Sequence, residues 1–224
     1  MKALNTYITE KLILNKDTFK KREYKYFPET KDELQKIIEK LLQERKDQEI
    51  IDLNDIDTSK ITDMSNLFYT ILPMKYINIK KIDVSFWDVS NVTNMYSIFE
   101  YCKNLESVGD LSSWNVSNVT DMNCIFKECF SLISPGDLSE WNIKEVSNFD
   151  YAFYNCVNLK YIGNISFWDM SKVRSVKKMF YNCERLTDIG DLDNWNLKNA
   201  KNIRGMLFGC KSFKTPTWYY KNTY

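Results

Sequence analysis

Residues 114–138 read WNVSNVTDMNCIFKECFSLISPGDL, and variants of this phrase recur along the chain at a spacing of 27 residues, as from Trp114 to Trp141. Two uncommon residue types mark the recurrence. Tryptophan stands at Trp87, Trp114, Trp141, Trp168 and Trp195, and cysteine at Cys102, Cys129, Cys156, Cys183 and Cys210. Two rare residue types held at one spacing through five copies indicate a repeat array.

Apolar residues inside one repeat occur at about every third position. They run Val89, Val92, Met95, Phe99, Cys102, Leu105, Val108, Leu111 and Trp114. An amphipathic helix mixes steps of three and four, and a half-buried strand alternates by two, so neither pattern matches the whole repeat. A chain that turns inward at this step and then returns to its starting column predicts a coil that must stack on its neighbours to bury its apolar side.

The repeated phrases resemble those of a known family. Residues 112–132, SSWNVSNVTDMNCIFKECFSL, and residues 166–186, SFWDMSKVRSVKKMFYNCERL, are similar to the BspA-like leucine-rich-repeat family, whose repeat reads roughly L-x-x-L-D-L-S-x-W-x-V-S-x-V-x-x-M-x-x-M-F-x-x-C. The resemblance covers about residues 51–213. It implies a leucine-rich-repeat solenoid with a short strand on one face and helical turns elsewhere. It also implies a bacterial surface or host-interacting protein.

This chain departs from the family pattern in two ways. The strand phrase carries an extra glycine, at Gly109, Gly136, Gly163 and Gly190, and the repeat degenerates near Ala200. The fold class that we expect is nevertheless an α/β repeat. It is a right-handed leucine-rich-repeat-like solenoid of about six 27-residue coils, built from short parallel strands and helical turns.

Residues 1–50 are expected to form a small strand-helix cap over the first coil. Lys11–Leu14 and Tyr24–Phe27 are short apolar runs typical of strands. Thr30 with Glu33 is a capping box, and the apolar spacing that follows predicts an amphipathic helix over about residues 31–46. The alternative is an unrelated small domain.

The solenoid itself is assigned to residues 51–213, and its first coil contains an insertion. Ile61 and Phe68 match Val92 and Phe99 at an offset of 31 residues, so four extra residues lie near Pro73 and predict a small loop. Residues 214–224 form an aromatic tail. That tail either shields the last coil or binds a partner.

Charge and hydropathy exclude several classes of protein. Lysine and arginine number 31 against 30 aspartate and glutamate residues, so bulk electrostatics favour neither nucleic acid nor an acidic membrane. We find no secretion signal in Met1–Thr30 and no apolar run long enough for a membrane span. A cytoplasmic monomer is therefore expected, with the cell surface as the alternative location.

Enzymatic chemistry is not expected. The chain has no histidine, which removes Ser-His-Asp and Cys-His catalysis together with the commonest zinc ligand. No phosphate-binding or dinucleotide motif occurs. Most cysteines stand a full repeat apart, which favours packing over metal binding, and only Cys124 lies outside the column as a candidate reactive thiol. We predict no catalytic residue, no cofactor and no metal.

Two polar columns accompany the apolar ones. The first contains Asp52, Asp83, Asp110, Asp137, Asn164 and Asp191, and the second contains Asp88, Asn115, Asn142, Asp169 and Asn196. Such side chains commonly accept backbone amides at turns, and every coil has corners to satisfy. The alternative is that the stacked carboxylates bind a cation such as calcium.

Two neighbouring columns change their chemistry from repeat to repeat. One reads Glu106, Ile133, Lys160, Thr187, and the other reads Ser107, Ser134, Tyr161, Asp188. They lie between inward-facing members of the strand phrase and should project from one face. We predict that Glu106, Lys160, Tyr161 and Asp188 contribute to binding a protein partner. Neutral drift on a solvated surface is the alternative, and a surface adhesin is the second functional hypothesis.

Overall fold

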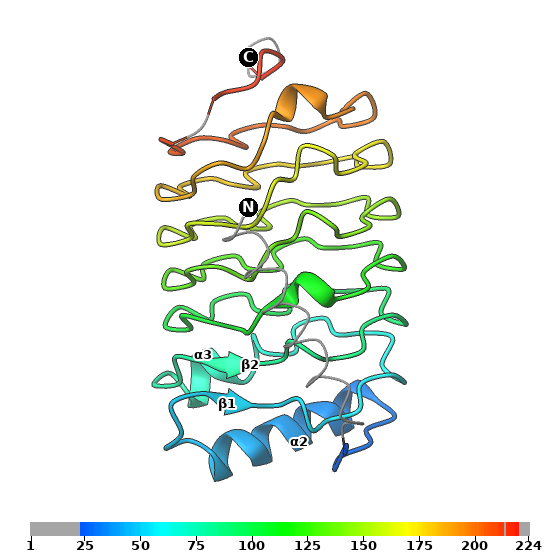
Figure 1. Ribbon diagram of the computed structural model, residues 1–224, viewed down its shortest axis with the longest axis vertical. Coiled ribbons are helices and arrows are strands. Elements are labelled where there is room, and N and C mark those ends of the chain that lie inside the picture. Colours follow the sequence, from blue (N-terminus) through cyan, green and yellow to red (C-terminus); the bar gives the residue numbers. More distant parts are fainter. Residues whose placement is uncertain (1–22, 213, 220–224) are drawn as a thin grey trace, which may run out of the picture.

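A computed structural model describes residues 23–212 and 214–219. Their backbone forms a stack of similar layers, with a helix at one end and residues 214–219 at the other (Figure 1). The regular elements in order are α2 (Lys31–Glu44), β1 (Ile51–Asp52), α3 (Leu72–Lys75), β2 (Ile82–Asp83) and two 3-10 turns, η1 (Leu111–Ser113) and η2 (Leu192–Asn194). We call each 27-residue repeat a layer.

The expected α/β architecture, a right-handed leucine-rich-repeat-like solenoid of about six coils with short parallel strands and helical turns, is wrong. Within residues 23–212 and 214–219 the only sheet has two strands, β1 and β2, which pair in parallel at Ile51 with Ile82 and Asp52 with Asp83. In the same described residues, helix is confined to α2, the four-residue α3 and the two 3-10 turns. Turns and loops make up most of the remaining chain.

The backbone hydrogen bonds explain why extended elements do not grow. Along each layer, amide groups alternate between a local turn and the adjacent layer. Ile98 donates to the carbonyl of Met95 three residues earlier, whereas Met95 and Phe99 donate to Asp121 and Ile125 of the next layer. A turn about every third residue interrupts each strand before it can lengthen, which also accounts for the apolar step of three.

Four consecutive layers also contain two corners each with left-handed backbone at residues other than glycine. Ser97, Cys124, Tyr151 and Lys178 form one column of such residues, and Tyr101, Glu128, Asn155 and Asn182 form the other. This conformation costs roughly 1–2 kcal/mol for a residue with a side chain. The amides of these residues donate to the next layer, as from Tyr101 to the carbonyl of Lys127 at 2.8 Å, and these bonds offset the strain.

Like side chains pack on like through the interior, as the columns predict. The rings of Phe99, Phe126 and Phe153 stack with centroids 5.2 and 5.4 Å apart, and all three are buried. Each tryptophan of the repeat donates its indole N–H to a carbonyl in the preceding layer, as from Trp141 to Leu111 at 2.9 Å. The buried polar atom of every indole is thus satisfied within the stack.

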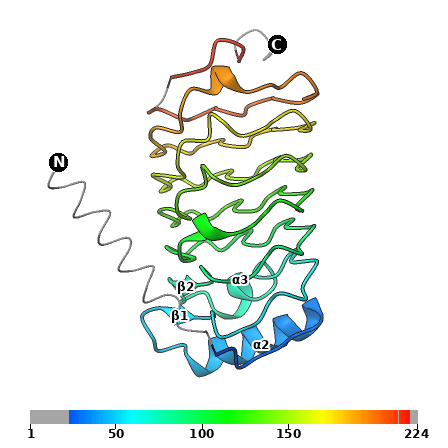
Figure 2. The ribbon, with the colours of Figure 1, turned by 45° about the vertical axis from the view of Figure 1, so that its right-hand side comes forward.

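The N-terminal end is covered by α2, which agrees with the helix expected over residues 31–46 (Figure 2). Thr30 accepts the Glu33 amide at 3.2 Å as the N-cap, and Leu34, Ile38, Leu41 and Leu42 are buried. The strand expected at Tyr24–Phe27 is reduced to one parallel bridge, between Tyr26 and Ile56. The strand expected at Lys11–Leu14 lies outside the described residues.

The C-terminal end is covered by part of the aromatic tail. Trp218 donates its indole N–H to the carbonyl of Leu192 at 2.8 Å, repeating the bond of the tryptophan column one layer further on. Tyr219 packs beside it, and its hydroxyl accepts the Leu207 amide at 3.3 Å. Of the two readings of the tail, these contacts favour shielding of the last layer.

Candidate recognition surface

The cysteine column has a packing role. Cys129 donates its thiol hydrogen to the carbonyl oxygen of Phe99 at 3.0 Å, and Cys156 and Cys183 make the same bond to Phe126 and Phe153. All six cysteines are free. Burial raises the pKa of the Cys129 thiol well above its ordinary value, so the thiols remain protonated donors at neutral pH.

Cys124, the candidate reactive thiol, likewise has a pKa that burial raises. Burial, assisted by the nearby Glu100 carboxylate, raises the pKa of Cys124 to about 12. A reactive cysteine has a depressed pKa in an electropositive, partly exposed setting. Cys124 is buried and its pKa has moved in the opposite direction. Among residues 23–212 and 214–219 no group of three histidine, cysteine or acidic residues is arranged to hold a metal ion.

The two polar columns form Asx turns, as expected. Asp110 and Asp137 each accept, at 3.0 Å, the amide of the residue two positions later, and Asn164 accepts the Ser166 amide at 3.1 Å. The second column behaves alike, as where Asp169 accepts the Ser171 amide at 3.0 Å. An amide oxygen therefore replaces a carboxylate oxygen here without loss of the turn.

These turns also explain the extra glycine of each repeat. Gly163 has a φ of +89°, and a Cβ atom added there would lie only 1.9 Å from Oδ1 of Asp137 in the preceding layer. The carboxylate that closes one turn thus occupies the space that a side chain would need in the next layer. Only glycine satisfies both the backbone angle and the close approach.

A third Asx column went unrecognised in the sequence. Asp63, Asn94, Asp121, Asn148 and Asn202 each accept the amide two residues later. The layer between Asn148 and Asn202 has Ser175 at this position. There the Asp150 carboxylate reaches from the preceding layer, accepting the Lys177 amide at 2.7 Å and the Ser175 hydroxyl. The 27-residue spacing of the Asx residues was the signal that could have identified this column.

The four predicted binding residues lie on one face, which we call the variable face and define by the columns 106, 133, 160, 187 and 107, 134, 161, 188. Backbone bonds connect it across layers: Ile133 donates to Glu106 at 3.2 Å, Lys160 to Ile133 at 2.9 Å and Thr187 to Lys160 at 3.1 Å. Lys160, Tyr161 and Asp188 are exposed, and Glu106 is half-buried. The face therefore presents Lys160, Tyr161 and Asp188 in adjacent rows, and Glu106 two rows before Lys160.

The four side chains differ in how far they are already engaged. Glu106 pairs with Lys80 at 3.3 Å, and the Tyr161 hydroxyl donates to Asp137 at 2.8 Å. Asp188 accepts the Gly190 amide at 2.8 Å through one oxygen. Lys160 forms no ion pair with the described part of the chain. Lys160 and the second oxygen of Asp188 are thus the charges most available to a partner.

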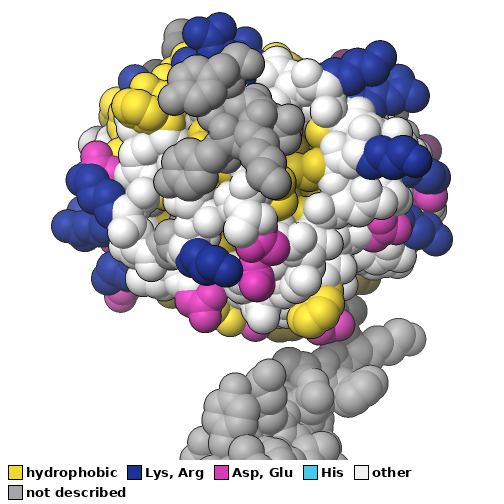
Figure 3. All heavy atoms as spheres, turned by 90° about the horizontal axis from the view of Figure 1, so that it is seen from above, with side chains coloured by type: hydrophobic (Ala, Val, Ile, Leu, Met, Phe, Trp, Pro, Cys, Tyr) yellow, Lys and Arg dark blue, Asp and Glu magenta, His cyan; other side chains and the backbone are white. Residues whose placement is uncertain are grey.

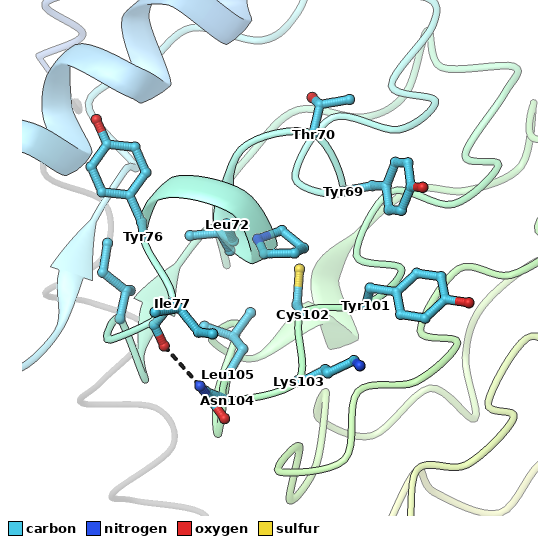
Figure 4. A pocket seen from close by; sticks show the side chains of 12 residues that line it. Tyr69, Thr70, Leu72, Tyr76, Ile77, Tyr101, Cys102, Lys103, Asn104 and Leu105 are labelled. Atoms are coloured by element: carbon cyan, nitrogen blue, oxygen red, sulfur yellow. Dashed lines mark hydrogen bonds between the residues drawn. The ribbon is translucent and has the colours of Figure 1, made fainter.

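Two hollows lie beside the variable face. A groove of about 630 Å³ is lined by Leu72, Pro73 and Ile77 of the inserted segment and by Tyr101 and Leu105 of the next layer (Figure 4). A hollow of about 340 Å³ has Lys80, Lys81 and Glu106 on its wall. The insertion predicted near Pro73 thus forms α3 and one wall of the groove. The sequence predicted the insertion but not the groove.

These features define a repeat protein whose stacked layers share one interior and present a chemically variable face. A family model described as "Mycoplasma protein of unknown function, DUF285" matches residues 36–161 and 130–223, and the chain belongs to this family. No curated protein and no solved structure matches the chain. In the described residues, no helix has the length and apolar character needed to cross a membrane.

Proposed function

We propose that this protein is a non-catalytic module that binds a protein partner through the variable face. The observation that carries the proposal is the contrast between interior and face. Four consecutive layers bury the same residue types, yet they present Glu106, Ile133, Lys160 and Thr187 in a single backbone-bonded column. Close packing explains why the interior keeps the same residue types, but it does not restrict the residue types on the face.

The chemistry of the face suits a protein interface. Ile133 is 45% exposed and Tyr161 is 44% exposed, and they lie beside the charges of Lys160 and Asp188. Interfaces combine apolar and aromatic contact residues with a polar rim, and tyrosine is enriched among the residues that contribute most binding energy. Tyr161 is also held in place by its bond to Asp137, which lowers the entropy lost on binding.

Affinity capture tests the proposal directly. The intact chain is immobilised beside a variant with Lys160→Glu, Tyr161→Ala and Asp188→Lys. We expect a partner retained by the intact chain to be lost from this variant. The matched control is Lys144→Glu, a charge reversal at an exposed lysine of an Asx turn. Identical capture by all three proteins would overturn the proposal and direct attention to the groove near Pro73.

A second candidate is a bacterial surface adhesin. It is supported by the resemblance of residues 51–213 to BspA-like surface-protein repeats and by membership of a family described from Mycoplasma. The test is fractionation of cells that express the protein, combined with protease treatment of intact cells. Surface protein is degraded by external protease, whereas recovery of all the protein intact in the cytosol would contradict the adhesin hypothesis and support a cytoplasmic binding module.

A further inference from the structure

A second surface, separate from the variable face, combines tyrosine rings with cations. We call it the tyrosine–lysine face and define it by Tyr151, Tyr154, Lys177, Lys178, Tyr181 and Arg204. Backbone bonds place its members in adjacent layers, since Tyr151 donates to the carbonyl of Lys177 at 2.8 Å and Lys178 donates to that of Arg204 at 3.0 Å. These six residues therefore form one continuous patch over three layers.

The lysines of this patch are held by aromatic rings. The Lys177 ammonium lies 5.3 Å from the centre of the Tyr151 ring, and the Lys178 ammonium lies 4.9 Å from that of Tyr181 and 5.6 Å from that of Tyr154. Cation–π contacts of this kind stabilise a cation without neutralising it. Each ammonium thus keeps its full charge while its side chain has already lost much of its rotamer freedom.

The charges on this face have few acidic neighbours. Elsewhere a lysine commonly pairs with a glutamate one layer before it, as Lys172 does with Glu145 and Lys211 with Glu184, both at 2.6 Å. Lys177, Lys178 and Arg204 make no such pair with the described residues. The adjacent Asp150 uses its Oδ1 to accept the Lys177 amide and the Ser175 hydroxyl. The patch therefore has three cationic side chains and one adjacent carboxylate.

The ring geometry selects among anionic partners. Tyr181 stacks on Tyr154 at 5.1 Å and on Phe208 at 4.8 Å, with interplanar angles of 22° and 17°. Tyr181 thus lies within a row of three rings, whose last member, Phe208, is 60% exposed. Single-stranded nucleic acids gain much of their affinity by stacking bases on open aromatic faces, and in this row the Tyr181 ring is already stacked on two neighbours. Carboxylates need only the cationic groups of the half-buried Lys177 and Lys178 and of the exposed Arg204.

We propose that the tyrosine–lysine face binds a short acidic peptide segment of a protein partner, with its carboxylates paired to Lys177, Lys178 and Arg204. Rows of adjacent layers lie about 4.8 Å apart, and an extended peptide rises about 3.3 Å per residue. Acidic residues one or two positions apart along a peptide therefore match cations in adjacent layers. The ordered lysines reduce the entropy cost of binding compared with free surface lysines.

Fluorescence anisotropy with labelled hexaglutamate tests this assignment on the full chain. We expect hexaglutamate to bind at low salt, hexaglutamine not to bind, and the affinity to fall as salt is raised. A Lys177→Gln, Lys178→Gln, Arg204→Gln variant should bind about tenfold more weakly or worse, since each exposed ion pair contributes up to roughly a fivefold change in Kd. The matched control removes three charges elsewhere, with Lys144→Gln, Lys198→Gln and Lys201→Gln.

Three outcomes would overturn the proposal. The first is equal loss of affinity in both triple variants, because net charge alone would then explain binding. The second is tighter binding of a single-stranded oligouridine, or of vesicles containing phosphatidylserine, than of hexaglutamate. The third is absence of hexaglutamate binding to the intact chain. Thermal unfolding of each variant verifies its fold, and should the triple variant unfold, Lys178→Gln alone should still weaken binding about two- to fivefold.

Discussion

At the scale of single residues, hydrogen bonds between layers do more than local preference to define the corners. The third Asx column shows this best, because Ser175 interrupts it and Asp150 supplies the missing acceptor from the layer before. Removing one partner of a buried bond leaves the other unsatisfied, which costs more than the bond itself contributes. Asp150 is thus a structural acidic residue whose sequence position gives no hint of its role.

We predict that Asp150→Ala lowers the free energy of unfolding by about 1–3 kcal/mol, because the Lys177 amide and Ser175 hydroxyl lose a charged acceptor. Adding Ser175→Asn should restore part of this loss, since Asn148 performs the same turn one layer earlier. Urea unfolding of both single variants and the double variant gives the coupling energy. Strictly additive effects would show that residue 175 cannot replace Asp150.

The buried thiols lead to a second prediction at this scale. Burial raises the pKa of Cys124 and of Cys210 to about 12 from an ordinary value of 9.0. The folded state therefore retains protons that the unfolded state releases, and stability should fall as pH rises from about 9 towards 12. Ellman's reagent at pH 8 should react slowly with the folded chain and rapidly in urea.

The urea midpoint measured from pH 8 to pH 10.5 checks the sign of this dependence. Cys124→Ala should make the urea midpoint fall less steeply with pH, because that variant has one thiol fewer to deprotonate on unfolding. Fast labelling of the folded protein at pH 8, or a midpoint that rises with pH, would contradict the raised pKa values.

At the scale of elements, α2 is the longest regular element among residues 23–212 and 214–219, and its sequence signals were sufficient to identify it. The Thr30 hydroxyl accepts the Glu33 amide, and the Glu33 carboxylate in turn accepts the Glu29 amide at 2.8 Å. Four buried aliphatic side chains then attach the helix to the first layer. By contrast, β1, β2 and α3 depend on neighbouring layers and are too short to be read from local sequence.

Loss of the helix cap should be measurable on its own. Thr30→Ala is expected to reduce stability by about 1 kcal/mol, because the N-terminal amide of Glu33 loses its acceptor. Thr30→Ser retains the hydroxyl and serves as the control. Denaturant unfolding followed by circular dichroism compares the two variants. Equal losses for alanine and serine would show that the hydroxyl group does not stabilise α2.

At the scale of the whole molecule, the stack behaves as a one-dimensional array in which each layer contacts only its neighbours. Both ends therefore need covering, and the chain covers them differently. An amphipathic helix closes the first layer, whereas Trp218 extends the tryptophan column over the last. Charged side chains of both signs surround the rim when the stack is viewed from the C-terminal end (Figure 3).

A substitution at one end of the stack should affect only the layers near that end. Trp218→Ala removes the indole bond to the Leu192 carbonyl and uncovers the last layer. Hydrogen exchange should accelerate for amides of residues 192–212, while those near Phe126 and Phe153 remain protected. Phe167→Ala, a substitution of an aromatic residue whose side chain is 83% exposed, is the comparison. Uniform acceleration throughout the stack would indicate that the whole molecule unfolds as a single unit.

Much of the candidate site was predictable, because it follows from the register of the repeat. The register placed Glu106, Lys160, Tyr161 and Asp188 on one face, and the offset of 31 residues located the insertion that forms α3. The groove beside α3 was not predictable, since its walls come from segments about 30 residues apart. The tyrosine–lysine face depends likewise on which side chains the layers bring together.

By itself, the sequence determined the 27-residue register, the columns of buried tryptophan, phenylalanine and cysteine, the Asx corners and the helix α2. Each of these depends on spacing or on contacts within a few residues. Only the tertiary structure decided that the repeat forms turns instead of the expected strands and helical turns. The reason is that each amide group chooses between a local carbonyl and one in the next layer, and that choice depends on atoms 27 residues away.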